Sequence, residues 1–443
     1  MCRILSEELE AANQIKNSAV EAENHVKHGA CSKSLMSRGN FLIRKSCFAL
    51  LVLLFNIFCF KVVIAQTEIS FEEYMKQVSS LMPQLNEYWE NKDYPAAEKI
   101  AKEAISLFYS LSKDEQEMYN SIQGELYFGL VFCLSTQNKR EAAIDAFEKA
   151  VNIYGFVNYL RANTDTNLDN IRDDARFIAL MGNLREKGDF IYLLRQTEKY
   201  QSADTTGLPR FTYEPASTDN LKKVRDFFNL DSIAGQGDEI SKIKNLLKWV
   251  QTNIRHDGSN HAPQVARNSI DIYSYHKSTG VGVNCRLLAI TLNELYLAMG
   301  FKSRFVTGMS KDESDAHVIN SVYSNTLDKW LWMDPTFNAY WKDENDNLLC
   351  IEEVRERVIE DRPLILNDDA NWNNQNKQTK ETYLDGFMAK YLYWFTRVAD
   401  SRFNPERSNE NQTYIALCPV GFEPSQSNVE YVITNDATYF WEH

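Results

Sequence analysis

The sequence predicts an α+β protein, in which an all-helical, repeat-like N-terminal region precedes a domain that contains an antiparallel sheet. Hydrophobic residues recur with a helical period from Ser70 to about Gln201, with polar breaks and few runs of β-branched residues. The segment ADTTGLPRFTYEP at 203–215 then interrupts this period with a glycine and two prolines. Beyond it, helical segments are followed by consecutive strand-like segments, an order typical of an α+β fold.

The N-terminus has the layout of a secretory signal peptide. Residues 47–60, CFALLVLLFNIFCF, form a 14-residue apolar run that follows basic residues and ends near VVIA, just before Gln66. We therefore expect 1–65 to be a signal peptide region, with Met36 as the alternative true start, and the mature protein to be periplasmic or secreted. The run is shorter than the roughly 18–20 apolar residues that span a bilayer. An uncleaved membrane anchor is the alternative interpretation.

Composition narrows the class of protein. Over 443 residues the formal net charge is -13, which argues against nucleic acid as a partner, because phosphate recognition needs clustered Lys and Arg. The apolar and charged contents, 44% and 25%, are ordinary for a globular chain. Beyond residue 65 the cysteines are scattered, with neither the density of a disulfide framework nor the spacing of a zinc site. These are Cys133, Cys285, Cys350 and Cys418.

The helical region, 66–205, contains an internal repetition of small residues. The segments KDYPAAEKIAKEAISLF and NKREAAIDAFEKAVNIY share a rhythm that recurs after 46 residues, as from Ala97 to Ala143. Small residues at these places allow close helix packing, and the segments resemble the second helix of a tetratricopeptide repeat. A generic helical bundle is the alternative. A tetratricopeptide-like region would bind a protein partner.

Cys285 lies where a long helix is expected to begin. In GVGVNCRLLAITLNELYLAMG, an apolar-periodic segment runs from Cys285 to Gly300. Asn284 suits the N-cap of such a helix and Gly300 the position just past its end. The first turn of a helix offers unpaired N–H groups and a dipole that favour a thiolate and can donate to an oxyanion. Cys285 is therefore a candidate nucleophile.

His317 and Asp334 lie on two expected strands, HVINSVYS and KWLWMD. If these strands form a hairpin that turns around Asn325-Thr326, the two side chains are equidistant from the turn and face each other directly. A carboxylate so placed orients the imidazole and stabilises its cation. With Cys285 they make a complete nucleophilic set of thiol, base and orienting acid.

Three segments together resemble the core of the transglutaminase-like superfamily: NCRLLAITLNELYLAMGFKSRFVTG, AHVINSVYS and KWLWMDPTFNAYW. In that family the Cys heads a helix, a strand follows, and His and Asp come from adjacent strands in that chain order. The resemblance covers about residues 210–345 and implies a papain-like fold for the domain 206–443. It also implies cysteine acyl chemistry with Cys285, His317 and Asp334 as the catalytic triad, without cofactor or metal. The residues that match the family's strand are Gly300, Phe301, Arg304, Val306 and Gly308.

The sequence departs from the family pattern beside the nucleophile. Asn284 and Arg286 flank Cys285, where a small residue usually precedes the Cys. The family's aromatic oxyanion donor has no assigned counterpart, because Trp249 falls on an expected core helix and Tyr323 on a strand. These departures concern the efficiency of the chemistry more than its type.

We expect an exported cysteine enzyme that hydrolyses peptide or amide bonds. Transfer to an amine, which would crosslink proteins, is less favoured because the carboxylate loops of the calcium-dependent animal enzymes are not evident. A binding protein with a degenerate domain is the second alternative. The cluster His256, Asp257 and His261 is interpreted as a hydrated loop rather than a metal site. After residue 350 we expect an acidic helix at 351–361, an Asn-rich loop at 367–377, an aromatic helix at 383–395 and short closing strands.

Overall fold

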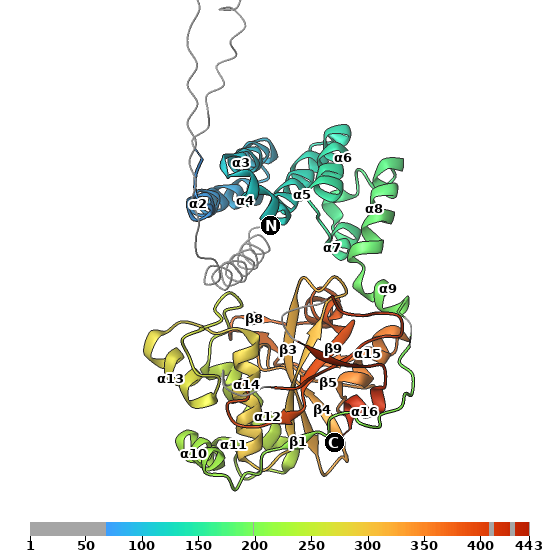
Figure 1. Ribbon diagram of the computed structural model, residues 1–443. Coiled ribbons are helices and arrows are strands. Elements are labelled where there is room, and N and C mark those ends of the chain that lie inside the picture. The colour runs from blue at the N-terminus through green and yellow to red at the C-terminus, as the bar shows by residue number, and fades with distance from the viewer. Residues whose placement is uncertain (1–67, 198, 407–411, 426–429, 443) are drawn as a thin grey trace, which may run out of the picture. The chain divides into compact units, whose positions relative to one another are not determined.

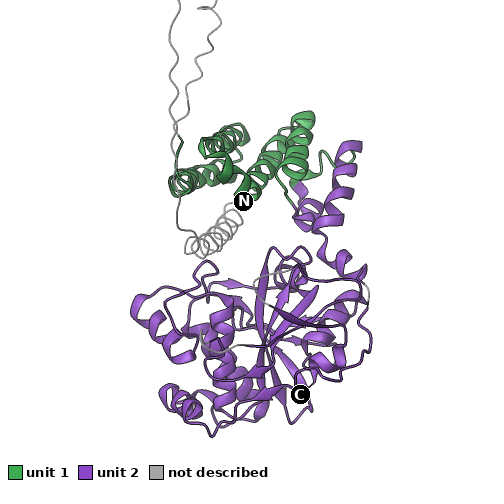
Figure 2. Cartoon of the chain, in the orientation of Figure 1, with its two compact units in different colours: residues 1–156, 167–173 green, residues 157–166, 174–443 purple. Residues whose placement is uncertain are grey.

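The computed structural model describes residues 68–442 except 198, 407–411 and 426–429 (Figure 1). The expected signal peptide and the alternative start at Met36 lie outside the described residues. Contacts divide the chain into two compact units (Figure 2). Unit 1 comprises Met1–Phe156 and Asn167–Asp173, and unit 2 comprises Val157–Thr166 and Asp174–His443. Among the described helices, none combines the length and the apolar character that a membrane crossing requires.

Unit 1 is built from two helical hairpins. Helix α2 packs on α3, α3 on α5, and α5 on α6. Each hairpin turns through one residue in the left-handed region, Lys92 in the first and Asn138 in the second, both with φ of 58°. These residues are 46 positions apart, the offset of the small-residue repetition. The bounds are α2 Phe71–Glu90, α3 Tyr94–Leu107, η1 Phe108–Ser110, α4 Lys113–Met118, α5 Asn120–Thr136, α6 Arg140–Glu148 and η2 Lys149–Ile153.

The repeated small residues of unit 1 lie at its helix contacts. Ala97, Ala104, Ala143 and Ala150 are completely buried. An Ala side chain keeps helical propensity while letting a neighbouring helix approach closely, so these positions account for the dense packing. The repetition therefore corresponds to two helical hairpins, whereas the tetratricopeptide-like label stays a prediction.

The helices after unit 1 pack with unit 2, so the division falls earlier in the chain than the expected boundary at 205/206. The segment interpreted as a linker also lies on unit 2: Gln201 N–H donates to Asn435 O at 3.1 Å, and Ala203 N–H to Asp436 Oδ2 at 2.9 Å. These helices are α7 Tyr159–Thr164, α8 Ala175–Gly188 and α9 Phe190–Arg195, whereas most of the short η3 Thr166–Leu168 belongs to unit 1.

The centre of unit 2 is a six-stranded sheet in the order β12-β11-β9-β2-β3-β4. Neighbours are antiparallel except β11 and β12, which are parallel. The strands are β2 Ser303–Met309, β3 Ala316–Ser324, β4 Lys329–Met333, β9 Trp394–Val398, β11 Tyr414–Leu417 and β12 Tyr431–Thr434. Three short pairs accompany it: β1 Thr212–Tyr213 with β10 Asp400–Ser401, β5 Trp341–Lys342 with β6 Ile365–Leu366, and β7 Asn371–Trp372 with β8 Asn376–Lys377.

Helices cover both faces of this sheet (Figure 1). Successive residues of a strand therefore enter different cores: Val318 packs with the α10–α14 side, and Ile319 with the α15 side. Both faces are covered, so β2 and β3 are buried along almost their whole length, including polar residues such as Arg304 and Asn320. The covering helices are α10 Asp219–Phe228, α11 Leu230–Ala234, α12 Glu239–Asn253, α13 Ser269–Thr279, α14 Cys285–Ala298, α15 Ile351–Ile359 and α16 Ala437–Trp441.

Two details differ from the expectation. In the β3–β4 hairpin Asn320 pairs with Met333 and Ser324 with Lys329, so His317 and Asp334 are two positions out of direct opposition. A four-residue turn, closed by Asp328 with φ of 52°, shifts the register. The expected aromatic helix at 383–395 is also wrong: a π-helical turn η4 (Glu381–Asp385) and a 3-10 turn η5 (Met388–Leu392) lead into strand β9.

Candidate active site

Cys285 is the first residue of α14, and Asn284 is the N-cap of that helix. The Asn284 side chain accepts a hydrogen bond from Leu287 N–H at 3.1 Å, as its predicted N-cap role requires. Within the described residues, the backbone N–H groups of Cys285 and Arg286 have no acceptor. Since these N–H groups lie at the positive end of the helix dipole, they are available to an anion beside the sulfur.

His317 and Asp334 are in direct contact. The distance from His317 Nε2 to Asp334 Oδ2 is 2.8 Å, and both side chains are buried. A two-residue shift in register keeps both side chains on the same face of the sheet, so the diagonal pair still meets. Because the charged carboxylate can only accept, His317 Nε2 carries a proton here and leaves Nδ1 for the thiol.

Electrostatics favour an ion pair between Cys285 and His317. Burial alone would raise the pKa of the Cys285 thiol, but hydrogen bonds from His256 and His317 lower this pKa from the ordinary 9.0 to about 6. Burial would likewise lower the pKa of His317, but the adjacent charge and hydrogen bond of Asp334 raise it from 6.5 to about 10. A thiolate beside an imidazolium is therefore the favoured form at neutral pH.

The C-terminal part of the domain completes the site. The Tyr383 hydroxyl donates to Asp334 Oδ2 at 2.6 Å, and Thr336 N–H donates to Oδ1 of the same carboxylate at 2.8 Å. Phe387 packs edge-on against the His317 ring, with 5.0 Å between the ring centroids. These contacts fix the carboxylate and shield the imidazole from water, which strengthens the charge interactions.

Gly308 permits this enclosure. It lies directly opposite His317 in the β2–β3 register. A Cβ atom at position 308 would stand 2.3 Å from the carbonyl oxygen of Tyr391. Tyr391 in turn packs near the His317 ring, with the centroids 6.0 Å apart, and its hydroxyl donates to Asp315 at 2.6 Å. The glycine that matched the family's strand motif thus lets the segment around Tyr391 reach the histidine.

His256 is a site residue that the sequence analysis assigned to a hydrated loop. Its backbone forms a bridge with Val283, two residues before Cys285, and the interaction of its side chain with the thiol helps to lower the Cys285 pKa. Gly282 allows this approach, because a Cβ atom there would lie 2.8 Å from Arg255 O and 3.0 Å from His256 C. Gly282 indicates a close approach of another segment just before Cys285. The periodicity of the sequence does not identify that segment as the one that contains His256.

The other candidates lie elsewhere. The Tyr323 hydroxyl hydrogen-bonds Asp328 at the hairpin turn, and Trp249 packs in an aromatic cluster with Phe228 and Tyr273. His261 binds the Asn284 side chain, with 3.0 Å between Asn284 Nδ2 and the ring Nδ1. In the part of the chain that the structure describes, no group of three or more His, Cys, Asp or Glu residues is arranged to hold a metal ion.

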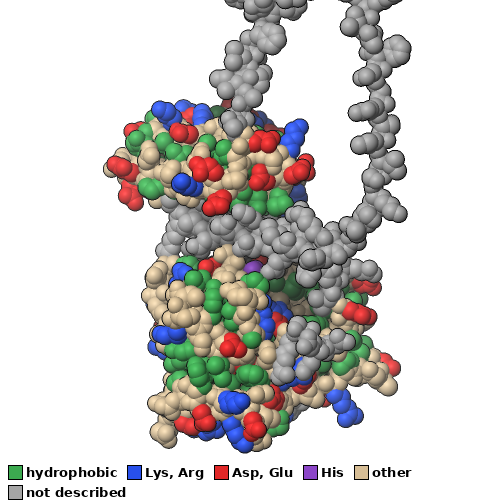
Figure 3. All heavy atoms as spheres, turned by 60° about the vertical axis from the view of Figure 1, so that its left-hand side comes forward, with side chains coloured by type: hydrophobic (Ala, Val, Ile, Leu, Met, Phe, Trp, Pro, Cys, Tyr) green, Lys and Arg blue, Asp and Glu red, His purple; other side chains and the backbone are tan. Residues whose placement is uncertain are grey.

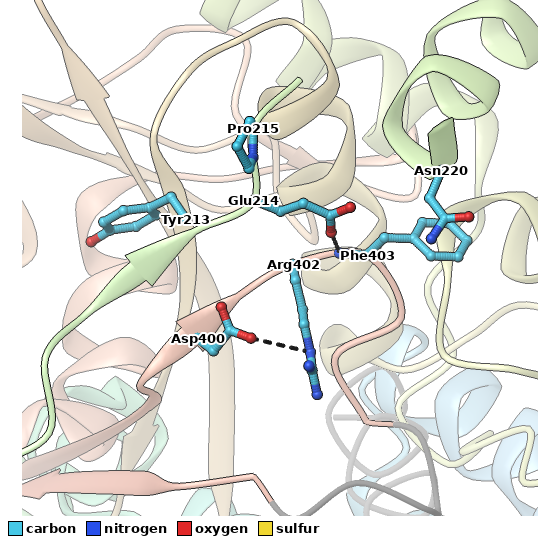
Figure 4. Close-up of a pocket in the computed structure, with 7 residues that line it drawn as sticks. All are labelled: Tyr213, Glu214, Pro215, Asn220, Asp400, Arg402 and Phe403. Carbon is cyan, nitrogen blue, oxygen red and sulfur yellow. Dashed lines mark hydrogen bonds and ion pairs between the residues drawn. The ribbon is translucent and has the colours of Figure 1, made fainter. Parts of the chain in front are cut away.

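A hollow of about 330 Å³ lies apart from these residues (Figure 4). Its lining carries both charges, with Arg402 paired to Asp400 at 3.3 Å and Glu214 accepting the Phe403 N–H at 2.7 Å. On the face seen in Figure 3, basic and acidic side chains are interspersed and do not form a continuous basic patch. None of the triad residues lines this hollow.

A thiol, an imidazole and a carboxylate in this order on an α+β scaffold define a cysteine-based acyl-transfer or hydrolase fold. Residues 228–335 match the family model described as the transglutaminase-like superfamily. The chain thus carries a domain of that superfamily, and the match includes Cys285, His317 and Asp334. It ends before Tyr383 and Phe387. No curated protein and no solved structure matches the chain.

Proposed function

We propose that this protein is an exported cysteine hydrolase that cleaves peptide or other amide bonds through Cys285, His317 and Asp334. The observation that carries the proposal is the 2.8 Å contact between His317 and Asp334, beside a thiol whose pKa is lowered to about 6. Three of the four cysteines in the described residues have the opposite character, since burial raises their pKa to about 12: Cys133, Cys350 and Cys418.

The proposed reaction has two halves. Cys285 Sγ attacks the carbonyl carbon and forms a C–S bond, while the carbonyl oxygen gains the negative charge and is met by the N–H groups at the start of α14. The C–N bond then breaks, and His317 gives its Nδ1 proton to the leaving amine. In the second half His317 takes a proton from water, the hydroxide attacks the thioester, and Cys285 leaves as thiolate.

The test is incubation of a mixed protein and peptide substrate pool in oxygen-labelled water, followed by mass spectrometry. Hydrolysis by this mechanism places the label in the new carboxyl groups, and the products disappear with Cys285→Ala. With an added primary amine, amide-linked amine without the label would instead indicate a transferase. If Cys285→Ala and the parent protein give the same products, the triad mechanism is wrong. Absence of any product in either protein supports the alternative of a binding protein.

Export rests on the expected signal peptide, and its test is independent of catalysis. N-terminal sequencing of the protein recovered from its cells should begin at Gln66. Recovery of residues 47–60 in a membrane fraction would instead support the anchored form. The helical hairpins of unit 1 support a second, separate expectation, a protein partner, which crosslinking before and after deletion of 68–156 would identify.

A further inference from the structure

His256 is held by partners that together fix its protonation. The indole Nε1–H of Trp372 donates to His256 Nδ1 at 3.0 Å. An indole nitrogen can only donate, so His256 Nδ1 must be the unprotonated, accepting nitrogen. The neutral ring then carries its proton on Nε2, which is the nitrogen left to face Cys285, the residue whose thiol pKa His256 lowers.

The backbone of His256 is clamped from the same loop. Asn373 accepts the His256 N–H at 2.7 Å and donates to the His256 carbonyl at 3.0 Å, so one side chain replaces a pair of strand hydrogen bonds. Asn373 itself has φ of 51°, a conformation that Asn tolerates well. The loop is tied to helix α12 by Gln251 Nε2, which donates to Asn371 Oδ1 at 2.8 Å.

We propose that His256 is a further catalytic residue, a neutral Nε2–H donor to the Cys285 thiolate and then to the oxyanion of the acyl intermediate, and that Trp372 is the positioning residue that holds this tautomer. The proposal rests on the proposed function for the oxyanion step. Residues 371–374 lie outside the family match, which ends at 335.

The division of labour between the two histidines follows from their partners. His317 faces a carboxylate, an acceptor, which favours its cation. His256 faces an indole N–H, a donor, which disfavours a second proton on Nδ1. Only one imidazolium is then present beside the thiolate. The neutral histidine contributes a fixed hydrogen-bond donor that needs no reorganisation when charge develops on the substrate oxygen.

The first test reads the tautomer directly and does not depend on activity. Nitrogen NMR of the histidine rings in the full chain should show His256 as the Nε2–H tautomer at neutral pH, and Trp372→Phe should introduce the Nδ1–H form. Trp394→Phe is the matched control, because its indole donates to Ser310 O at 3.0 Å, away from the histidines. A wild-type signal of the Nδ1–H form would overturn the proposal, even if the protein cleaves amides.

The second test separates catalysis from structure. His256→Ala should lower the rate of amide cleavage by about 100- to 1,000-fold, the usual cost of one oxyanion donor. His256→Gln, which keeps a side-chain N–H, should restore part of it. Trp372→Phe should cost about fivefold, the factor of one ordinary hydrogen bond, and nothing further in the His256→Gln background. An equal loss in both backgrounds would mean that Trp372 only supports the fold.

The outcomes distinguish the two proposals. An Nε2–H tautomer at His256 with a reactive Cys285, but without amide cleavage, would leave the thiolate contact standing and remove the proposed function. Amide cleavage that depends on Cys285 but is insensitive to His256→Ala would keep the proposed function and overturn the role of His256.

Discussion

Removal of the His317 imidazole should change how the reactivity of Cys285 depends on pH. In the intact protein the thiol, with a pKa of about 6, is about nine-tenths thiolate at pH 7. Thiols with a pKa of about 12, such as Cys133, are thiolate in about one part in 100,000. Intrinsic nucleophilicity falls with pKa, by a factor of about 500 over this difference. Cys285 should therefore react about 200-fold faster than the buried thiols with a disulfide reagent.

In His317→Ala the thiol loses its cationic partner but stays half-buried and keeps its interaction with His256, and we take its pKa to return to the ordinary 9.0. The thiolate fraction at pH 6 then falls about 500-fold, while the remaining thiolate is about 20-fold more nucleophilic. The variant should thus react about 20-fold more slowly at pH 6 and about 10-fold faster at pH 9. The two rate curves should cross at about pH 7.7.

The assay is the rate of thiol release from dithiodipyridine against pH, with Cys285→Ser to subtract every other cysteine. His276→Ala is the matched control, since that ring bonds the Val281 carbonyl at 2.9 Å and does not touch the sulfur. It should leave the curve unchanged. The same midpoint in the parent protein and His317→Ala would refute the ion pair, and a midpoint near 9 in both would mean that the triad is not functional.

Three further outcomes are expected. Tyr383→Phe should lower the free energy of unfolding by about 1–3 kcal/mol in urea titrations, because Asp334 loses a buried 2.6 Å hydrogen bond; an unchanged transition would mean that a water replaces the hydroxyl. Gly308→Ala should cost about 1–3 kcal/mol by overpacking against Tyr391, and slow the disulfide reaction at pH 6; full reactivity there would contradict the enclosure. In Cys285→Ser the free energy of unfolding should fall as pH rises above 6.5, because the raised pKa of His317 is no longer balanced by the lowered pKa of Cys285. The intact protein should show no such slope between pH 6.5 and 9. Urea titrations across that range will decide.

The sequence was sufficient to predict that His317 and Asp334 meet, even where its geometric argument was inexact. The expected pairing of β3 with β4 differs from the observed pairing by two residues, because the turn between the paired ends contains four residues rather than two. A shift of one residue would have sent Asp334 to the other face of the sheet, but a shift of two preserves the face. The alternation of side chains is thus a more robust basis for prediction than the exact pairing.

The rest of the site could not be predicted from local patterns. Trp372, Tyr383 and Phe387 reach their partners from segments far along the chain, and period and propensity carry no information about such docking. The segment 383–395 has helical composition, but tertiary contacts override that preference: Tyr383 and Phe387 turn inward and Trp394 begins a strand. The position of His256 beside Cys285 depends on the close approach of its backbone to Gly282, which the sequence alone does not reveal.

The pair Cys285 and His317 binds the same number of protons as its unfolded counterpart over the physiological range. His317, with its pKa raised from 6.5 to about 10, stabilises the fold fully below pH 6.5 and loses this effect as pH rises to about 10. Cys285, with its pKa lowered from 9.0 to about 6, stabilises the fold fully above pH 9 and loses this effect as pH falls to about 6. Between 6.5 and 9 the folded pair holds one proton on the imidazole and the unfolded pair holds one on the sulfur. The proton transfer that prepares the nucleophile therefore adds no slope to stability there, and only removal of one partner exposes the contribution of the other.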